Sequence, residues 1–465
     1  MIKIGGQRVP TRTLLLIASD TLLVLLAVLL GVLLRFLDFD QALAYIRQHQ
    51  SFGRFSVVVV VCCVVLYFYD LYQPEILDRR IELFVRTSQA LGTACLILAM
   101  LYYFDPSRSL GRGIAILASP FIILFTLGWR LFVGSAGWMM TDPERVLVVG
   151  TGAAGISVVR EILAHPELHL QVVGFLDEKG QNIGKSLVNP GIIGGVSDLE
   201  SVVGERKIRR LILSLAERRG NTPVRELLQM KFAGIAVEDA HSFHERTTGR
   251  IPLEHLAPSW LILSEGFSKS TLMTYGKRVS DIVASSLALV LALPIMVVVA
   301  LAILVESGWP IFFRQERTGL NGRSFEIMKF RSMYQNAEAN GPVWASADDR
   351  RVTRVGKIIR KCRFDELPQL LNVLRGEMSL VGPRPERPVF CRMLEEQIPY
   401  YGLRHSVRPG ITGWAQIKYQ YGGSVEEAKT KLEFDLFYVK HISMLLDFAI
   451  LFETAKVVIY GRGAK

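Results

Sequence analysis

Four apolar blocks in the first third of the chain constrain its fold more than any other feature. They are Leu14–Leu34, Phe55–Tyr69, Leu91–Phe104 and Ile114–Val133. The first and last approach the roughly 20 residues that a membrane-spanning helix needs, and the middle two reach that length only with their flanks. Buried core helices are the alternative, but four successive blocks with short polar joins favour membrane spans. The sequence therefore predicts a membrane protein with a four-helix transmembrane bundle in residues 1–140.

Charges in and around these blocks bear on their packing and orientation. Asp20 lies inside the first block, and we expect its side chain to face other helices and not lipid. Arginines flank the blocks on both sides, so the positive-inside rule orients the bundle only weakly. We place both ends of the bundle in the cytoplasm because the next domain has the character of a soluble, nucleotide-related domain.

Composition narrows the class of partner. The 465-residue chain has a formal net charge of +11, which suggests an anionic partner such as nucleic acid, acidic lipid or a phosphorylated substrate. The apolar blocks favour lipid and phosphate, so we expect no nucleic acid. The five cysteines show no metal-binding spacing, and we expect neither disulfides nor a metal cluster.

An alternation of strands and helices begins near residue 141. The sequence R-V-L-V-V-G-T-G-A-A-G-I is typical of a strand, a glycine turn and a helix, with Gly150, Gly152 and Gly155 in the G-x-G-x-x-G spacing. Further strands are predicted at 171–176, 210–215 and 234–238. Asp177 follows the second strand, about where a ribose-binding acid would lie. These features predict a Rossmann-like α/β domain over residues 141–268. The glycines would bind NAD or another nucleotide, and a vestigial or regulatory module without a cofactor is the open alternative.

The stretch Arg363–Glu386 carries the strongest chemical signal. It predicts a short helix with Asp365 at the N-cap, Glu366 in the first turn and Gly376 at the C-cap. A plain capping role for Asp365 is weakened by Pro368, which has no N–H about where a capping carboxylate would find a donor.

Two adjacent carboxylates at a helix N-terminus suit phosphate chemistry. Such a terminus can hold an ionised carboxylate and a phosphate near each other. One carboxylate could attack phosphorus while its neighbour holds a divalent metal on the phosphate oxygens. Arg384 stands between two prolines that fix its backbone, and it would offer a planar fork to phosphate.

The segment F-D-E-L-P-Q-L-L-N-V-L-R-G-E-M-S-L-V-G-P-R-P-E resembles the signature of bacterial polyprenyl-phosphate hexose-1-phosphate transferases. These are the membrane phosphoglycosyl transferases that start exopolysaccharide and O-antigen repeat units. Ile398–Gln416 and Tyr438–Asp447 are similar to the exopolysaccharide subgroup associated with PEP-CTERM (exosortase) protein-sorting systems. The resemblance covers the chain from about Tyr275 to its end, and the preceding layout at the level of architecture.

The resemblance implies a reaction at the bacterial inner membrane, with the catalytic domain facing the cytoplasm. Asp365 would attack the β-phosphorus of a UDP-hexose, release UMP and carry a covalent phosphosugar. Undecaprenyl phosphate would then accept the hexose 1-phosphate. Glu366 would hold Mg²⁺, which neutralises developing charge.

Other cations are candidates to bind phosphate, beside Arg384. Lys329 and Arg331 lie on the second of two strand-like pieces that a tight hairpin joins. A solvated edge strand is the alternative for these two residues. Arg404 and Arg408 would contact the uridine diphosphate or the lipid phosphate, or would only brace the fold.

A fifth apolar run, Ile282–Val305, has the length of a membrane span but contains Pro294. A span would place the catalytic stretch on the opposite side from the Rossmann-like domain, away from cytoplasmic nucleotide sugars. A central proline removes one helix hydrogen bond and permits a kink. We therefore expect a re-entrant membrane helix in residues 269–310, which the resemblance also implies. The family typically breaks this helix at Ser-Pro, whereas Leu293 precedes the proline here.

Residues 311–465 are predicted to form a monotopic, mainly α catalytic domain. Asp349–Arg363 is strongly basic and predicts an amphipathic helix at an anionic lipid surface, with a merely solvated basic face as the alternative. The last apolar run, Ile442–Tyr460, contains charged residues, so an interfacial or packed helix is favoured over a span.

Two other classes of function stay open. A membrane-tethered nucleotide-sugar oxidoreductase or epimerase would bind NAD(P) at the glycine turn, although no Tyr-x-x-x-Lys pair is recognisable downstream. A non-catalytic scaffold of a polysaccharide-export complex would be indifferent to Asp365 and Glu366. The sequence leaves open which hexose is transferred and whether the protein is a homodimer.

Overall fold

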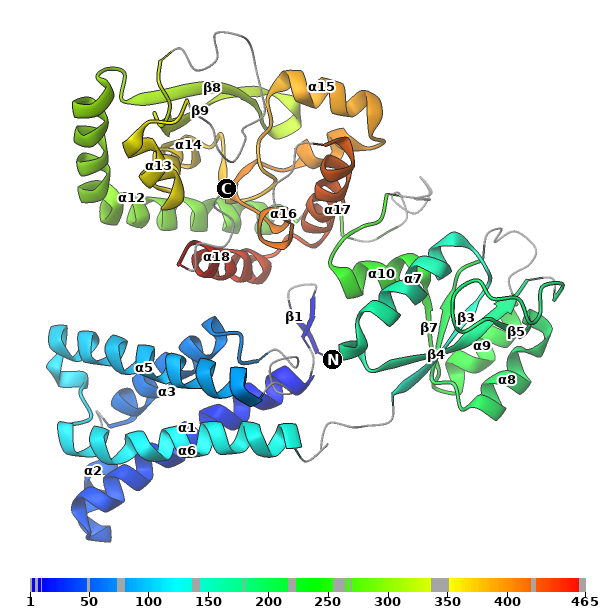
Figure 1. Cartoon of the computed structure of the whole chain (residues 1–465), viewed down its shortest axis with the longest axis horizontal. Coiled ribbons are helices and arrows are strands. Elements are labelled where there is room, and N and C mark those ends of the chain that lie inside the picture. The colour runs from blue at the N-terminus through cyan, green and yellow to red at the C-terminus, as the bar shows by residue number, and fades with distance from the viewer. Residues whose placement is uncertain are drawn as a thin grey trace. The chain divides into compact units, whose positions relative to one another are not determined.

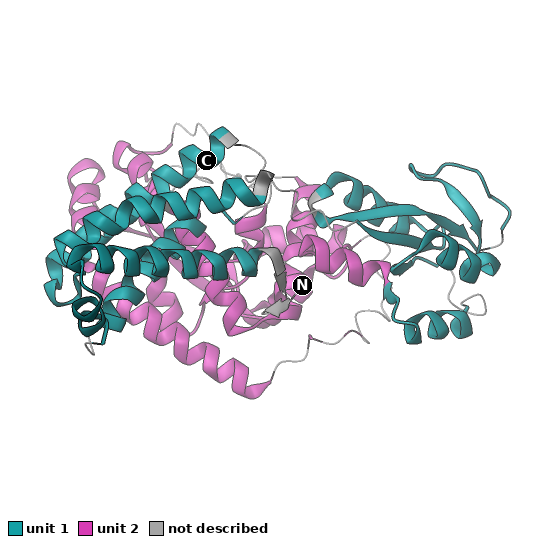
Figure 2. Ribbon diagram, turned by 90° about the horizontal axis from the view of Figure 1, so that it is seen from below, with its two compact units in different colours: residues 1–3, 8–238 teal, residues 4–7, 239–465 magenta. Residues whose placement is uncertain are grey.

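A computed structural model of the chain describes residues 2–4, 7–9, 11–47, 51–72, 80–135, 143–178, 180–215, 223–253, 264, 266–267, 270–335, 351–419 and 424–459. It divides into two compact units, shown in two colours in Figure 2. The first comprises residues 1–3 and 8–238, and the second comprises residues 4–7 and 239–465.

The N-terminal part is helical, after a short pair of strands, β1 (Ile2–Ile4) and β2 (Gln7–Val9). Within the described residues 11–135, four long apolar helices and the short α2 (Phe39–Arg47) share one hydrophobic core. The long helices are α1 (Thr11–Phe36), α3 (Ser51–Phe68), α5 (Arg80–Phe104) and α6 (Arg112–Ser135). The helix α1 packs against α6 and α3, and α3 packs against α5. Each long helix covers one predicted apolar block and is long and apolar enough to cross a membrane.

An ion pair lies inside this helical part. Asp20 on α1 and Arg130 on α6 are both fully buried. The two terminal nitrogens of Arg130 donate to the two carboxylate oxygens of Asp20 at 2.8 and 2.6 Å. The prediction that Asp20 faces another helix is confirmed, and bidentate pairing supplies the partner that lipid could not.

The α/β domain has the predicted fold. Its sheet has the strand order β5-β4-β3-β6-β7 in the described residues, which matches the first five strands of the six-stranded Rossmann order. The strand β3 pairs in parallel with β4 and β6, and β4 with β5. The strands are β3 (Glu144–Val149), β4 (Leu170–Asp177), β5 (Ile192–Gly195), β6 (Arg210–Leu213) and β7 (Ala236–Asp239). The helices are α7 (Ala153–Ala164), α8 (Leu199–Arg206) and α9 (Val224–Phe232). Only β5 was not predicted, because it is four residues long and half glycine.

The second unit combines short strands with helices, as Figure 1 shows. An antiparallel hairpin, β8 (Phe312–Thr318) and β9 (Ser324–Phe330), confirms the predicted hairpin. A parallel pair joins β10 (Ser379–Val381) to β11 (Gly410–Thr412). The helices are α10 (Ala240–Thr248), α12 (Thr271–Ser307), α13 (Arg354–Lys361), α14 (Gln369–Arg375), α15 (Pro388–Gln397), α16 (Trp414–Lys418), α17 (Val425–His441) and α18 (Met444–Ile459).

The main segment of the second unit starts at residue 239, so α10 belongs to this unit, whereas the predicted boundary at 268 grouped the segment with the Rossmann-like domain. Glu245 on α10 is buried and pairs with Lys440 at 2.8 Å and His441 at 2.6 Å on α17. Trp414 donates its indole N–H to the carbonyl of Gly249 at 2.7 Å. These contacts make α10 part of the core of the second unit.

The long helix α12 contains Pro294 and is drawn in Figure 1 as two arms that meet at a bend. On the first arm, Arg278 donates to the carbonyls of Val373 and Leu374 on α14 at 2.6 and 2.8 Å. On the second arm, residues 299 and 303 pack against residues 364 and 367, just before α14. A straight helix would separate residues 278 and 303 by about 37 Å, whereas residues 367 and 374 lie only about 10 Å apart along a helix. Both arms can reach this segment because α12 bends.

The chain around the carboxylate dyad, Asp365 and Glu366, differs in one respect from the prediction. Asp365 does not cap α14: it lies inside a preceding 3₁₀ turn, Phe364–Glu366, and the N-cap of α14 is Pro368. Because Pro368 lacks an N–H, the chain here winds with tighter bonds, such as Leu367 N–H to the Phe364 carbonyl at 3.2 Å. Gly376 ends α14 with a φ of +87°, which confirms the predicted C-cap.

Two predicted amphipathic segments are helical. The basic helix α13 starts with a Thr353 side-chain cap, buries Ile359 and leaves Ile358 64% exposed beside its cations; residues 349–350 lie outside the described part. The final helix α18 buries Leu446 and Ile450 in the core while Phe448 is exposed, so one face of it packs on the domain; its interfacial position stays a prediction.

Candidate active site

The adjacent carboxylates Asp365 and Glu366 are each only 9% exposed. The residue that leads into them, Arg363, has a left-handed φ of +60°. This conformation is uncommon for a residue other than glycine, and such strain concentrates at functional sites. It turns the chain from α13 into the 3₁₀ turn that presents both carboxylates.

Glu366 is surrounded by positive charge. Among the described residues, Oε1 of Glu366 pairs with Arg384 Nη2 at 3.0 Å, Lys329 Nζ at 3.3 Å and Arg363 Nη1 at 3.8 Å. Burial alone would raise the pKa of Glu366, but the charges of Lys329, Arg384 and Arg363 outweigh it and hold the pKa well below its usual range. The ionised form of Glu366 is thus favoured, and this carboxylate pairs with cations from three segments of the chain.

Asp365 is in the opposite situation. Its Oδ1 is buried and has no hydrogen-bond partner in the part of the chain that the structure describes. Burial, followed by the charge of Glu366, raises the pKa of Asp365, while Lys329, Arg360 and Arg363 oppose that shift. A carboxylate with an unengaged oxygen next to a fixed anion and several cations is the candidate nucleophile of this site.

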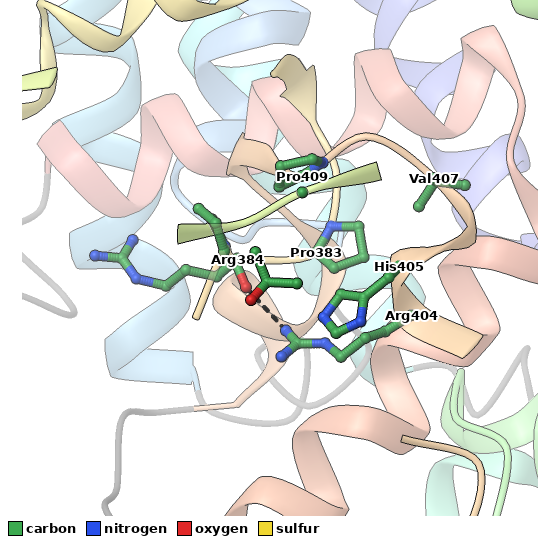
Figure 3. Close-up of a pocket in the computed structure, with 9 residues that line it drawn as sticks. Pro383, Arg384, Arg404, His405, Val407 and Pro409 are labelled. Carbon is green, nitrogen blue, oxygen red and sulfur yellow. Dashed lines mark hydrogen bonds between the residues drawn. The ribbon is translucent and has the colours of Figure 1, made fainter. Parts of the chain in front are cut away.

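Arg384 is held in place from both ends. Its Nη1 donates to Oε1 of Gln416 at 3.0 Å while Nη2 donates to Glu366. Its main-chain carbonyl accepts a bond of 2.9 Å from Arg404, drawn as the dashed line in Figure 3. The guanidinium is thus fixed beside the dyad, so that phosphate would meet a preorganised donor.

The turn that carries Arg384 packs tightly on its neighbour. Gly382 donates to the carbonyl of Thr412, and Gly410 donates to that of Pro383, both at 2.9 Å. A Cβ added to Gly410 would lie 2.1 Å from the nitrogen of Gly382. The glycines of the V-G-P-R-P and R-P-G-I-T-G segments are therefore required by this close approach of two backbones.

A small pocket lies behind this turn. Its lining includes Pro383, Arg404, His405, Val407 and Pro409, and the Arg384 side chain points away from it (Figure 3). Burial, with the nearby charge of Arg404, lowers the pKa of His405 to about 4. The pocket is thus lined by a neutral histidine, and the guanidinium of Arg384 belongs to the dyad and not to this pocket.

Lys329 lies on β9, and Arg331 directly follows the end of that strand. Lys329 reaches Glu366, whereas the buried Arg331 donates to the carbonyls of Ser307 and Gly308 at 2.7 and 2.6 Å. Arg331 thereby caps the end of α12. Its predicted contact with phosphate stays a prediction.

The other two predicted arginines also have contacts within the fold. Arg404 is buried and pairs with Asp435 at 2.7 Å, and Arg408 donates to the carbonyl of Gly376 at 2.9 Å. These contacts match the bracing alternative, and a role with uridine diphosphate or lipid phosphate stays a prediction. The structure therefore brings Asp365, Glu366, Lys329 and Arg384 together and places Arg331, Arg404 and Arg408 around them.

Sequence reasoning did not single out two residues of this cluster. Arg363 was counted only in a basic run, because its left-handed conformation cannot be read from its neighbours. Gln416 is 32 residues from Arg384 in sequence, and no local spacing connects them. Its place at the end of the family-like segment Ile398–Gln416 was the one available signal.

The glycine turn of the α/β domain uses its polar groups internally. Gly155 N–H donates to the Ser214 hydroxyl at 2.6 Å, and a Cβ on Gly150 or Gly152 would lie 2.5 or 2.6 Å from the Ser214 carbonyl oxygen. Asp177 is buried and accepts a bond of 2.9 Å from the Gln181 N–H. Close packing against Ser214 is thus sufficient to explain the glycines, and a role in binding NAD or another nucleotide stays a prediction.

Two segments of the chain match the models of known protein families. Residues 272–461 match the model of the bacterial sugar transferase family, and residues 67–230 match that of a CoA-binding domain. The chain is 43% identical over 241 residues to the UDP-N-acetylgalactosamine-undecaprenyl-phosphate N-acetylgalactosaminephosphotransferase of Aeromonas hydrophila, covering 52% of this chain and 56% of the relative. It is 34% identical to the undecaprenyl-phosphate glucose phosphotransferase of Komagataeibacter xylinus, over 69% of this chain and 60% of the relative.

The chain thus spans less than two thirds of these two relatives. A third relative is matched over most of its length. The UDP-glucose:undecaprenyl-phosphate glucose-1-phosphate transferase of Klebsiella pneumoniae is 31% identical, over 80% of this chain and 83% of the relative. With the dyad, its cations and this coverage together, the chain belongs to the bacterial sugar transferase family.

Proposed function

We propose that this protein transfers hexose 1-phosphate from a UDP-hexose to undecaprenyl phosphate and releases UMP, as the first membrane step of exopolysaccharide biosynthesis. The contrast within the dyad supports this proposal: Glu366 is engaged by three cations of the described residues, while Asp365 keeps an oxygen without a partner there. A carboxylate in that state is suited to attack phosphorus, and the cations are suited to stabilise phosphate charge.

The reaction proceeds in two displacements at one phosphorus atom. Asp365 forms a P–O bond to the β-phosphorus, the bond to the bridging oxygen breaks, and UMP leaves with the electron pair. An oxygen of undecaprenyl phosphate then attacks the phosphorus, and the acyl-phosphate bond breaks to restore the carboxylate. Each step exchanges one P–O bond for another, so neither needs an oxidant or a reductant. Arg384 and Lys329 donate to the phosphate oxygens as charge moves.

Mg²⁺ fits this site when it is shared with the substrate. The described residues contain no group of three or more His, Cys, Asp or Glu side chains able to hold a metal. Mg²⁺ often binds through one or two carboxylates together with substrate phosphates and water. Lys329 and Arg384 both donate to Oε1 of Glu366, and the second oxygen of this carboxylate would bind the ion. When bound, Mg²⁺ would neutralise charge on the phosphate oxygens.

We propose that α12 re-enters one leaflet and that the four long N-terminal helices span the bacterial inner membrane. Residues 286–298 of α12, around the bend, are all exposed or half-buried although they are almost entirely apolar. The exposed Ile358 beside the cations of α13 suits an anionic lipid surface. The catalytic unit faces the cytoplasm, where UDP-sugars are found. Membership of the PEP-CTERM-associated subgroup and a homodimeric state also stay predictions.

UMP release tests the proposal. Purified membrane protein would be assayed with Mg²⁺, undecaprenyl phosphate and a panel of UDP-sugars. Wild type should release UMP with at least one sugar. Without lipid, it should exchange labelled UMP into that UDP-sugar, which reports the covalent intermediate. Absence of release from every sugar, or activity untouched by Asp365→Asn, would contradict the proposal and favour the scaffold or oxidoreductase alternatives.

A further inference from the structure

Gln369 is a buried side chain beside the dyad that the mechanism has not yet used. It is only 3% exposed and is the first residue of α14. Its amide nitrogen Nε2 is buried and has no hydrogen-bond partner among the described residues. Nearly all buried polar groups in proteins are paired, so an unpaired amide donor points to a group that is not part of the chain.

The contacts on either side of Gln369 show which way it faces. Glu366, three residues earlier, reaches Lys329 on β9. Asn372, three residues later, accepts from the Met328 N–H at 3.0 Å and donates to the Glu326 carbonyl at 2.8 Å, also on β9. Residues at this spacing share one side of a helix. By this spacing, Gln369 lies on the side of the segment that faces β9, between the contacts of Glu366 and Asn372.

A second unpaired group lies within one turn. Asp365, four residues before Gln369, has the unpartnered Oδ1 described above. An amide N–H and a carboxylate oxygen are natural hydrogen-bond partners, yet the two are not bonded to each other. A phosphoryl group would satisfy both, because its phosphorus bonds to the carboxylate oxygen while a non-bridging oxygen accepts from the amide.

We propose that Gln369 is a catalytic residue that donates a hydrogen bond to a non-bridging oxygen of the transferred phosphoryl group. The inference rests on the proposed function and adds a neutral donor to the cations Lys329 and Arg384. When Asp365 attacks, the β-phosphorus gains the bond to the carboxylate and loses the bond to UMP. The amide keeps both its hydrogens and stabilises the charge on the equatorial oxygen in each displacement.

Gln369→Met is the decisive variant, because methionine has a similar length and no donor. The exposed Gln397→Met at the end of α15 is the matched control. Exchange of labelled UMP into the UDP-sugar, measured in full-length protein, should fall about 10- to 100-fold in Gln369→Met. The melting temperature should be unchanged or higher, because an unpaired buried amide has been replaced by an apolar group. Gln397→Met should behave as wild type.

Four outcomes would overturn the inference. Wild-type exchange in Gln369→Met would leave the proposed function standing and remove Gln369 from it. A fall in both exchange and melting temperature would assign Gln369 to the fold instead. A loss confined to one sugar of the panel would mean a contact with the hexose and not with the phosphoryl group. Inactivity of wild type with every UDP-sugar would overturn the proposed function as well.

Discussion

The chain has two regions whose sequences both suggest a phosphate site, and their structures differ in how polar groups are used. In the glycine turn, the N–H of Gly155 donates to the Ser214 hydroxyl. At the end of β4, Asp177 accepts a hydrogen bond from the N–H of Gln181. At the dyad and the start of α14, Oδ1 of Asp365 and Nε2 of Gln369 are buried and unpaired within the described residues. A motif shows which groups are present, whereas unpaired buried groups show where a ligand is expected.

The largest expected effect comes from one change made in both regions. Asp365→Asn should reduce UMP release by about 10⁴-fold or more, because the nucleophile is lost. The matched Asp177→Asn should keep transferase activity within a few-fold of wild type, as its amide oxygen can still accept from Gln181. Loss of activity in Asp177→Asn would show that the α/β domain is needed for the reaction. Gly152→Val is a poorer control, because its Cβ would lie 2.6 Å from the Ser214 oxygen and disturb the fold.

Arg384→Met should have the next largest effect. It removes the donors to Glu366 and Gln416 and, in the proposed mechanism, one charged donor to phosphate, so kcat/KM should fall about 10- to 1000-fold. Steady-state kinetics with the UDP-sugar measures this change. Arg314→Met, at an exposed strand position, is the control. Equal kcat/KM values in the two variants would show that the Arg384 side chain does not contribute to catalysis.

The pH dependence of exchange should report the dyad. Asp365 must be ionised to attack, and its pKa is raised, so wild-type activity should decline on acidification at a higher pH than an ordinary aspartate would give. In Glu366→Gln the like charge is gone, so the pKa of Asp365 should fall and the acid limb of the residual activity should move to lower pH. A limb that moves to higher pH would show that Glu366 acts mainly by retaining the cations.

Ser214→Ala should give the smallest effect. It removes the hydroxyl that accepts from Gly155, which should lower the local stability of the turn by about 1 kcal/mol and leave UMP release unchanged. Amide hydrogen exchange at the start of α7 measures the change, expected to be about fivefold faster. A change in transferase rate would show coupling between the α/β domain and the dyad.

Local patterns explain what could be predicted. The dyad, the Pro-Arg-Pro turn and the strands β4 and β6 are each encoded within a few consecutive residues, so spacing and turn chemistry were sufficient. The prediction that Asp365 caps α14 was wrong, because this residue lies in the 3₁₀ turn before that helix. The hydrophobic spacing of the sequence does not distinguish the backbone hydrogen bonds of a 3₁₀ turn from those of an α-helix.

Features that depend on contacts between distant segments could not be predicted from the sequence. The pairing of Gln416 with Arg384, the packing of α10 on α17 and the use of Arg331 at the end of α12 join residues far apart in sequence. Each of these residues is polar and unremarkable in its local context. Only the tertiary structure distinguishes a cation beside the dyad from one that stabilises the fold.

The bend of α12 would limit how deeply this helix enters the membrane. The buried positions of α12 lie within residues 278–285 and 299–307. The apolar residues 286–298 between them, which include the bend, are not covered by the rest of the second unit. At 1.5 Å per residue, residues 286–298 make about 20 Å of helix, so the two arms extend roughly 10 Å on average past the domain, less than half of the ~30 Å hydrocarbon core. Such an anchor would end inside one leaflet. Since both arms also hold the segment that carries Asp365, the height of the nucleophile above the lipid would be a fixed dimension of the protein.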